Sequence, residues 1–341
     1  MIPAAFDYVR AGSAAEAISL IGEHGDDAKF LAGGHSLLPL MKLRLASPSV
    51  LVDIGRVTDL SYIRDAGDHV AIGALTRHAE VEHSSLLAQH VPLLAHAASH
   101  VGDPQVRHRG TIGGSIAHAD AASDLPATTL ALGATYVVQG PKGRRSIAAK
   151  DFFTGFLENA MSPDEMLVEI QVPKMNGAGW SFQKFNRRAQ DWAIVGVAAW
   201  RRGNESGVAL VNMGSTPILA TSVSGAIASG ASVSDAAQLA AAEAHNIAFL
   251  GAPLDESAIA KVQALTTTQL NAMSKTSLDA VDVSKFLNAQ LAGMTSGIGN
   301  LSTTQICQGG GLSHISLILQ GIDRQNTTGP TRMTRNKCHI S

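Results

Sequence analysis

TIGGSIAHADAASDLPA, residues 111–127, is the stretch from which the organisation of the chain follows. It contains a glycine pair, Gly113 and Gly114, then small residues, and then Asp124 before a leucine and a proline. Glycine has no Cβ and adopts positive φ angles readily, so we expect the backbone here to press against a bound polar group. A turn followed by a helix that Ser123 or Asp124 caps is an equally consistent alternative.

A second glycine pair of the same kind occurs earlier in the chain. Residues 28–31 form a short apolar run that predicts a strand, AGGHS follows at 32–36, and residues 37–45 have a helical pattern. Successive backbone N–H groups in such a turn can bind an anion. The pattern is neither G-x-G-x-x-G nor a P-loop, so it does not predict a Rossmann or P-loop nucleotide fold.

Taken together, the two glycine motifs indicate a ligand that carries both phosphate and hydroxyl groups. A dinucleotide or a flavin fits, because a diphosphate suits the backbone amides and a ribityl chain suits Asp124. The reactive chemistry would then belong to the cofactor.

Composition limits the class of protein. The chain has 341 residues, of which 45% are hydrophobic and 16% charged, and this is typical of a globular protein with two or three domains. A net charge of −2 and 4% aromatic residues argue against nucleic acid as the main partner. The two cysteines, Cys307 and Cys338, are too few for a cysteine-ligated cluster or a disulfide framework. No signal peptide or membrane span is visible, and we expect a soluble, cytoplasmic protein.

The remaining pattern predicts an α+β chain in two parts. Ser13 to Glu16 forms a capping box for a helix that ends at Gly22 or Gly25. Helices are further predicted over 76–82, 86–100 and 125–132, and strands over 51–54, 70–72, 136–139, 145–148 and 166–172. After a linker at 176–179, strands over 180–185, 193–200 and 208–213 predict an antiparallel sheet, and helices follow over 220–228 and 235–248.

Other catalytic or metal-binding patterns are weak. Asp120 and Asp124 would form an i, i+4 pair if the segment were helical, but this alone is thin support for acid–base catalysis. His96 and His100 also stand at i, i+4, yet no third ligand accompanies them, so surface histidines are the favoured interpretation.

The two glycine motifs, AGGHSLLPLMKLRL (32–45) and TIGGSIAHADAASDLPA (111–127), closely resemble the FAD-binding motifs of one flavoprotein family. This family is the medium subunit of aerobic carbon monoxide dehydrogenase and its xanthine dehydrogenase-like relatives, the molybdenum hydroxylases. Segments 2–21, 164–173 and 182–200 agree with the same family. The resemblance implies an α+β fold: a two-lobed FAD-binding domain over 1–175, then a smaller domain with a three-stranded antiparallel sheet and helices over 176–290. An atypical polar tail covers 291–341.

The resemblance also implies roles for individual residues. The FAD diphosphate would be bound by the backbone amides of Ala32, Gly33, Gly34, His35 and Ser36, with Lys29 near the nucleotide. Thr111, Gly113, Gly114 and Ser115 would bind the other side of the cofactor, although many relatives carry asparagine in place of Ser115. Ser123 and Asp124 would hold the ribityl hydroxyls, and Leu167 and Lys184 would lie beside the isoalloxazine ring. No catalytic residue and no metal ligand is expected in this chain.

In this family a large subunit with a molybdenum–pterin centre oxidises the substrate. A small subunit with two two-iron two-sulfur clusters passes electrons to the FAD, which hands them to an external acceptor. The resemblance therefore implies both subunits as partners, in a dimer of heterotrimers. Two alternatives are a self-sufficient FAD-dependent oxidoreductase that acts on a small organic substrate, and a flavin-free scaffold or assembly relative.

The chain departs from the family near its end. An arginine expected after Pro217 is absent, and after about Ala252 the usual Asp-Arg-Gly-Ser-type stretch, Tyr-Arg pair and alanine–arginine-rich helix are missing. A shifted reading frame or an unrelated extension would each explain the polar tail. The final helix of the second domain is the feature that this departure puts in question.

Overall fold

The computed structural model describes residues 2–188 and 190–245. The predicted tail over 291–341, the end of the predicted 235–248 helix and the rest of the second predicted domain lie outside these residues. No helix of the described part is long and apolar enough to cross a bilayer.

The N-terminal segment forms a parallel three-stranded sheet of order β1-β3-β2. Its strands are β1 (Asp7–Arg10), β2 (Ala28–Leu31) and β3 (Val50–Asp53), and its helices are α1 (Ala14–His24) and α2 (Leu37–Lys42). Ser13 caps α1 as predicted, because its Oγ accepts from the amide of Glu16 at 3.1 Å. The helix ends at Gly25, whose φ is +57°, and not at Gly22.

The middle of the chain forms an antiparallel five-stranded sheet of order β4-β5-β10-β6-β7. Its strands are β4 (Ile63–Asp65), β5 (His69–Gly73), β6 (Thr135–Gly140), β7 (Gly143–Ala148) and β10 (Met166–Pro173), and a small hairpin pairs β8 (Phe153–Gly155) with β9 (Glu158–Asn159). The helices are α3 (His78–His83), α4 (Ser85–His90), α5 (Pro92–Ser99), α6 (Pro104–Arg109), α7 (Ile112–His118) and α8 (Asp124–Ala131).

The single helix predicted over 86–100 is wrong, because Pro92 interrupts it. α4 ends at His90, and Pro92 occupies the first turn of the separate helix α5. Proline has no N–H and so cannot continue the ladder of the preceding helix, but it fits a helix start.

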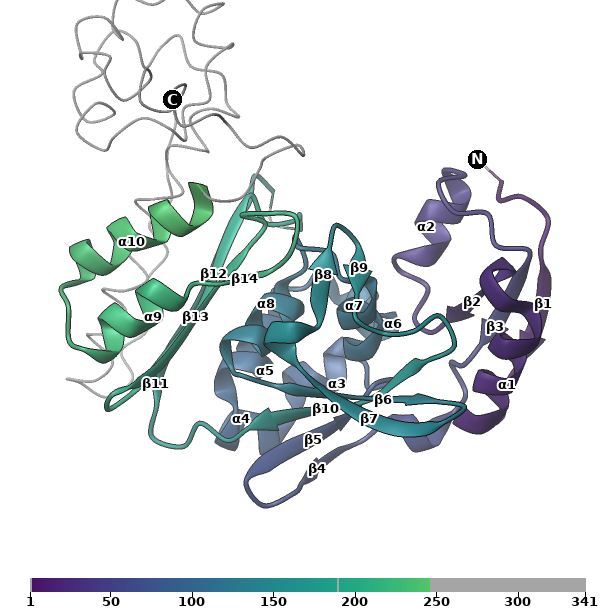
Figure 1. The fold of residues 1–341 in the computed structure, drawn as a ribbon, viewed down its shortest axis with the longest axis horizontal. Helices are drawn as coiled ribbons and strands as arrows, with labels where there is room; N and C mark the ends of the chain where they lie inside the picture. Colours follow the sequence, from purple (N-terminus) through teal and green to yellow (C-terminus); the bar gives the residue numbers. More distant parts are fainter. Residues whose placement is uncertain (1, 189, 246–341) are drawn as a thin grey trace, which may run out of the picture.

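The last described segment forms an antiparallel sheet of order β11-β12-β13-β14. The three predicted strands are present as β11 (Gly179–Phe185), β12 (Val195–Arg202) and β13 (Glu205–Val211), and a two-residue strand β14 (Ile218–Leu219) adds a fourth. Helices α9 (Thr221–Ala228) and α10 (Val233–His245) lie side by side on one face of this sheet (Figure 1). The opposite face packs on α8, where Trp200 Nε1 donates to Ala131 O at 2.7 Å.

The side chains of β10 are divided between two cores. The side chains of Met166 and Val168 join the core beside the first sheet, whereas those of Leu167 and Ile170 join the core beneath the helices. A bulge between Leu167 and Glu169 shifts the pairing with β6, so the strict alternation of a strand is broken there. The strand is therefore buried on both faces, where its sequence predicted a half-buried strand.

Candidate functional site

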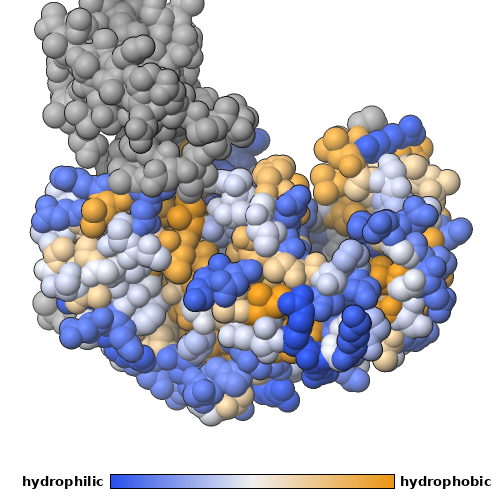
Figure 2. All heavy atoms as spheres, in the orientation of Figure 1, coloured by the Kyte–Doolittle hydropathy of each residue, from blue (hydrophilic) through white to orange (hydrophobic). Residues whose placement is uncertain are grey.

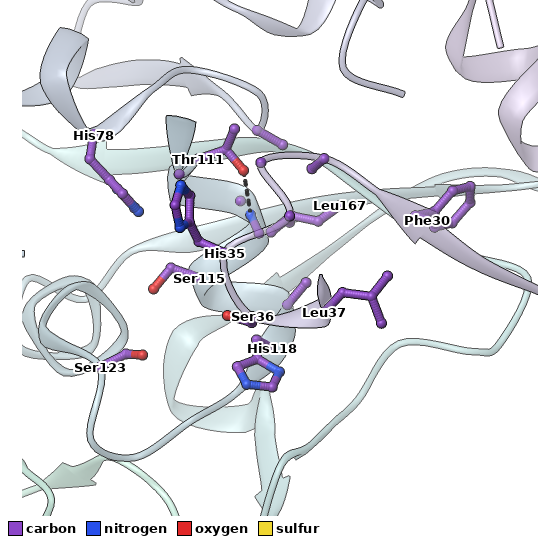
Figure 3. Close-up of a pocket in the computed structure, with 18 of the residues that line it drawn as sticks. Phe30, His35, Ser36, Leu37, His78, Thr111, Ser115, His118, Ser123 and Leu167 are labelled. Atoms are coloured by element: carbon purple, nitrogen blue, oxygen red, sulfur yellow. Dashed lines mark hydrogen bonds between the residues drawn. The ribbon is translucent and has the colours of Figure 1, made fainter. Parts of the chain in front are cut away.

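A cavity of about 710 Å³ lies between the first sheet with α2 and the helices that cover the second sheet. The volume is within the range of about 300–1,000 Å³ that is usual for cofactor sites. Figure 2 shows the surface hollowed beside α2, and Figure 3 shows side chains from both motifs facing one space. Every site residue expected from the sequence lines this cavity: Lys29, Ala32, Gly33, Gly34, His35, Ser36, Thr111, Gly113, Gly114, Ser115, Ser123, Asp124, Leu167 and Lys184.

The turn between β2 and α2 presents a run of free backbone donors. The amides of residues 33–36 make no hydrogen bond to any other described residue. Gly34 has a φ of +78°, a conformation that glycine adopts without strain. Consecutive free N–H groups on a cavity wall form a concave site for an anion.

The second motif differs from the prediction. Gly113 and Gly114 lie in helix α7 and do not have positive φ angles. Their amides are already used: Gly113 N donates to Ala74 O at 2.9 Å, and Gly114 N donates to Thr111 Oγ1 at 3.1 Å (Figure 3). The segment therefore offers the cavity a compact wall and the Ser115 side chain, not a second set of free amides.

The glycines serve to bring three backbone segments into contact. A Cβ on Gly33 would lie 2.5 Å from the carbonyl oxygen of Arg109 and 2.9 Å from Gly110 Cα. A Cβ on Gly113 would lie 2.5 Å from Ala74 Cβ and 2.6 Å from Ala74 O. Both contacts are too close for any side chain, so the first motif reaches residues 109–110, and the second reaches Ala74, only because these positions are glycine.

Asp124 and Lys184 form a buried ion pair at the other end of the site. Lys184 Nζ lies 2.7 Å from Asp124 Oδ2, the two side chains are 4% and 5% exposed, and Nζ also donates to His100 O at 3.0 Å. Burial raises the pKa of Asp124 to about 6, although Lys184 opposes this shift. The second oxygen, Oδ1, is buried and has no partner among the described residues. The pair thus leaves one acceptor unsatisfied at the cavity.

Two arrangements that the sequence left open near Asp124 are absent from the described structure. Asp120 lies in the turn between α7 and α8, where Oδ1 accepts from Ala122 N at 2.9 Å, so it does not share a helical face with Asp124. Ser123 precedes α8 but its side chain makes no capping hydrogen bond. Both the Ser123 hydroxyl and the Asp124 carboxylate are therefore left facing the cavity.

Two residues of the cavity wall carry no recognisable sequence signal. His78, the first residue of α3, is 4% exposed, and its Nδ1 has no partner in the described part of the chain. Burial, together with repulsion from His35, Arg77 and Arg107, lowers the pKa of His78 to about 4. Trp192, which is 57% exposed, lines the edge of the cavity. A lone histidine and a lone tryptophan in a sequence have no spacing that could identify them.

The His96–His100 pair stays outside the site. Their Nε2 atoms are 3.3 Å apart, and neither residue lines the cavity. Within residues 2–188 and 190–245 no group of three or more potential ligands is placed to hold a metal ion. Both histidines are exposed, as the interpretation as surface histidines expects.

Comparison with known proteins gives consistent matches. The family described as the FAD binding domain in molybdopterin dehydrogenase matches residues 4–175. The carbon monoxide dehydrogenase medium chain of Hydrogenophaga pseudoflava is 44% identical over 224 residues, which are 65% of this chain and 78% of that protein. The 6-hydroxypseudooxynicotine dehydrogenase complex subunit alpha of Paenarthrobacter nicotinovorans is 46% identical over 200 residues, 58% of this chain and 68% of that protein.

Solved structures agree with these sequence matches. A structure of carbon monoxide dehydrogenase from Hydrogenophaga pseudoflava, which lacks the molybdenum–pyranopterin moiety, superposes with a TM-score of 0.75 at 34% identity. The match covers 95% of this chain and 99% of the other. Quinoline 2-oxidoreductase from Pseudomonas putida 86 superposes with a TM-score of 0.68 at 27% identity and covers 94% and 99%.

Proposed function

Because the chain belongs to the family of FAD-binding medium subunits of molybdenum hydroxylases, we propose that it is the electron-transfer subunit of such an enzyme. In this role it takes electrons from the two-iron two-sulfur clusters of a partner subunit and passes them, through FAD, to an external acceptor. The family establishes FAD as the cofactor. The electron route and the residues that hold the FAD are our proposal.

The observation that carries the proposal is that one cavity is lined by two kinds of polar group without partners: the backbone amides of residues 33–36 and one carboxylate oxygen of Asp124. A run of free amides at residues 33–36 suits the oxygens of a diphosphate, and the free oxygen of Asp124 suits the hydroxyls of a ribityl chain. FAD contains both groups. A buried oxygen without a partner is costly, and Asp124 Oδ1 lies in the same cavity as the free amides, so both point to a ligand that completes them.

FAD, when bound, supplies reversible acceptance of electrons. The residues of the chain bind and orient it. The amides at 33–36 donate to the diphosphate, Ser115 faces the same region, and Lys29 lies near the nucleotide. Asp124 accepts from the ribityl hydroxyls, and Lys184 favours the ionised carboxylate that this requires.

The bulge in β10 contributes to the same site. Beside it, Leu167 and Met166 both line the cavity, whereas Val168 packs in the core next to the first sheet. We propose that Leu167 and Lys184 lie beside the isoalloxazine ring. We also propose that the first and second sheets belong to two lobes of one FAD-binding domain over 1–175, which holds the cofactor between them.

The partners that we propose are a large molybdenum–pterin subunit and a small iron–sulfur subunit, in a dimer of heterotrimers. The sequence supports this division, because two cysteines cannot supply the four thiolates of even one two-iron two-sulfur cluster. The names of the relatives support it as well, since they are the medium chain of carbon monoxide dehydrogenase and a subunit of a dehydrogenase complex.

The test is a binding series with the full chain and three ligands: FAD, riboflavin and ADP. The wild-type chain should bind FAD and show the absorption bands of oxidised flavin. Asp124→Asn removes the negative charge but keeps the size, so it should weaken FAD and riboflavin by about 10-fold or more and leave ADP unchanged. A chain that binds no FAD, alone or with its partner subunits, would refute the proposal.

A further inference from the structure

His78 is a polar side chain that the chain itself leaves without a partner. Its imidazole is 4% exposed and lies on the wall of the cavity. Its Nδ1 has no hydrogen-bond partner among the described residues. Buried polar groups almost always have partners, and exceptions call for an explanation such as a missing ligand. Nothing in the resemblance or in the comparisons assigns a role to this residue.

The position of His78 relates it to the turn at residues 33–36. The backbone amide of His78 donates to Gly110 O at 3.0 Å, and a Cβ on Gly110 would lie 2.6 Å from the imidazole Cδ2. Gly110 in turn is in contact with Gly33, whose added Cβ would lie 2.9 Å from Gly110 Cα. Figure 3 shows the imidazole directed from the start of α3 toward His35. Through Gly110, the ring is therefore close to the turn that carries the free amides.

The surroundings of His78 favour an anion. Arg77 and Arg107 are cationic neighbours that disfavour a charged imidazole, and Arg107 also pairs with Glu82 at 2.7 Å. The imidazole itself is uncharged in this setting, so it keeps one N–H to donate and one nitrogen to accept. A neutral donor among cations matches the oxygens of a phosphate group.

We propose that the imidazole of His78 donates a hydrogen bond to the diphosphate of the bound dinucleotide and is a further binding residue of this site. The inference rests on the proposed function, because it requires that FAD occupies the cavity. His78 acts on the diphosphate half of the cofactor, whereas Asp124 acts on the ribityl half.

The experiment measures the affinity of the full chain for FAD, ADP, adenosine and riboflavin. His78→Leu keeps the volume and removes the donor, so FAD and ADP should bind about 10- to 100-fold more weakly. Adenosine and riboflavin should bind as they do to the wild type. His78→Asn and His78→Gln place an amide N–H near the two ring nitrogens, and at least one of them should bind FAD better than His78→Leu. His83→Leu, an exposed position on the same helix, is the matched control.

If His78→Leu lost the same affinity for all four ligands, His78 would have only a structural role and the inference would be overturned. An unchanged affinity for ADP, or a loss for adenosine as large as that for ADP, would overturn it as well. If the leucine variant does not fold, the wild-type chain with ¹⁵N-labelled histidine decides: ADP should shift the imidazole resonances of His78 and riboflavin should not. Failure of the wild type to bind FAD would instead refute the proposed function, so the two failures are distinguishable.

Discussion

Replacement of Gly113 by alanine tests whether the shape of the cavity depends on the close contact between Gly113 in α7 and Ala74. The added Cβ would lie 2.5 Å from Ala74 Cβ, 2.6 Å from Ala74 O and 2.8 Å from Ala74 Cα. Two of these three atoms belong to the backbone just after β5, so no side-chain rotation can relieve the clash. Helix α7 must move away from Ala74, which lengthens the hydrogen bond from Gly113 N to Ala74 O.

The expected magnitude follows from two opposing effects. Overpacking of this kind costs about 1–3 kcal/mol, and alanine recovers up to about 1 kcal/mol of helix propensity. The net loss of up to about 3 kcal/mol lowers the midpoint of thermal unfolding by up to roughly 6 °C for a chain of this size. Because α7 also carries Ser115 and lies against the turn at 32–36, the affinity for FAD should fall by about 10-fold or more.

The assay is thermal unfolding followed by circular dichroism, with FAD binding measured on the same samples. Gly22→Ala in α1 and Gly225→Ala in α9 are matched controls, because nothing lies within 4 Å of either added Cβ. Both controls should be neutral or slightly stabilised, by up to about 1 kcal/mol. If Gly113→Ala unfolds at the same temperature as the controls and binds FAD normally, the close approach described here does not shape the site.

Three further outcomes are expected. Riboflavin should bind more tightly to the wild-type chain as the pH rises through about 6, where the Asp124 carboxyl ionises, and a profile of Asp124→Asn with the same slope would contradict this. The pKa of His78 is about 4 in the folded chain, against an ordinary 6.5. Because the unfolded chain takes up this proton first, the free energy of unfolding falls as the pH drops from about 6.5 toward 4. That loss is roughly 3 kcal/mol, and denaturant unfolding of His78→Leu at pH 4 to 7 should lack it. Thr111→Val removes the oxygen that caps Gly114 N and should cost about 0.5–2 kcal/mol in thermal unfolding, whereas an equal cost for Thr111→Ser would exclude capping as the cause.

The sequence predicted the position of the site better than its chemistry. AGGHS and TIGGS indicated two segments around one ligand, and the structure brings both to one cavity. The prediction of two bends with free amides was wrong for the second segment, because Thr76, Ala74 and Thr111 accept the amides of residues 112–115. Two of these acceptors lie some 35–40 residues away in sequence. A local pattern cannot show that a distant carbonyl already occupies a donor.

The ion pair of Asp124 with Lys184 shows the same limit. Asp124 was expected to bind ribityl hydroxyls, both from its carboxylate and from the resemblance, and Lys184 was expected to lie near the ring from the resemblance alone. Their contact at 2.7 Å joins α8 to β11 across 60 residues, and no spacing rule predicts it. By contrast, the break at Pro92 could have been predicted, because proline fits a helix start and not a helix interior.

The arrangement of glycines suggests why this cavity can bind a large cofactor without a charged cluster. Gly33, Gly110 and Gly113 allow backbone segments to touch, so part of the wall is main chain with fixed positions rather than flexible side chains. A wall of this kind holds the amides at 33–36 ready for a diphosphate before the ligand arrives, which lowers the entropic cost of binding. The few side chains that remain unsatisfied, Asp124 and His78, then determine which polar groups of the ligand are recognised. On this reasoning, substitutions at the glycines weaken every part of FAD alike, whereas substitutions at Asp124 and His78 separate the ribityl half from the diphosphate half.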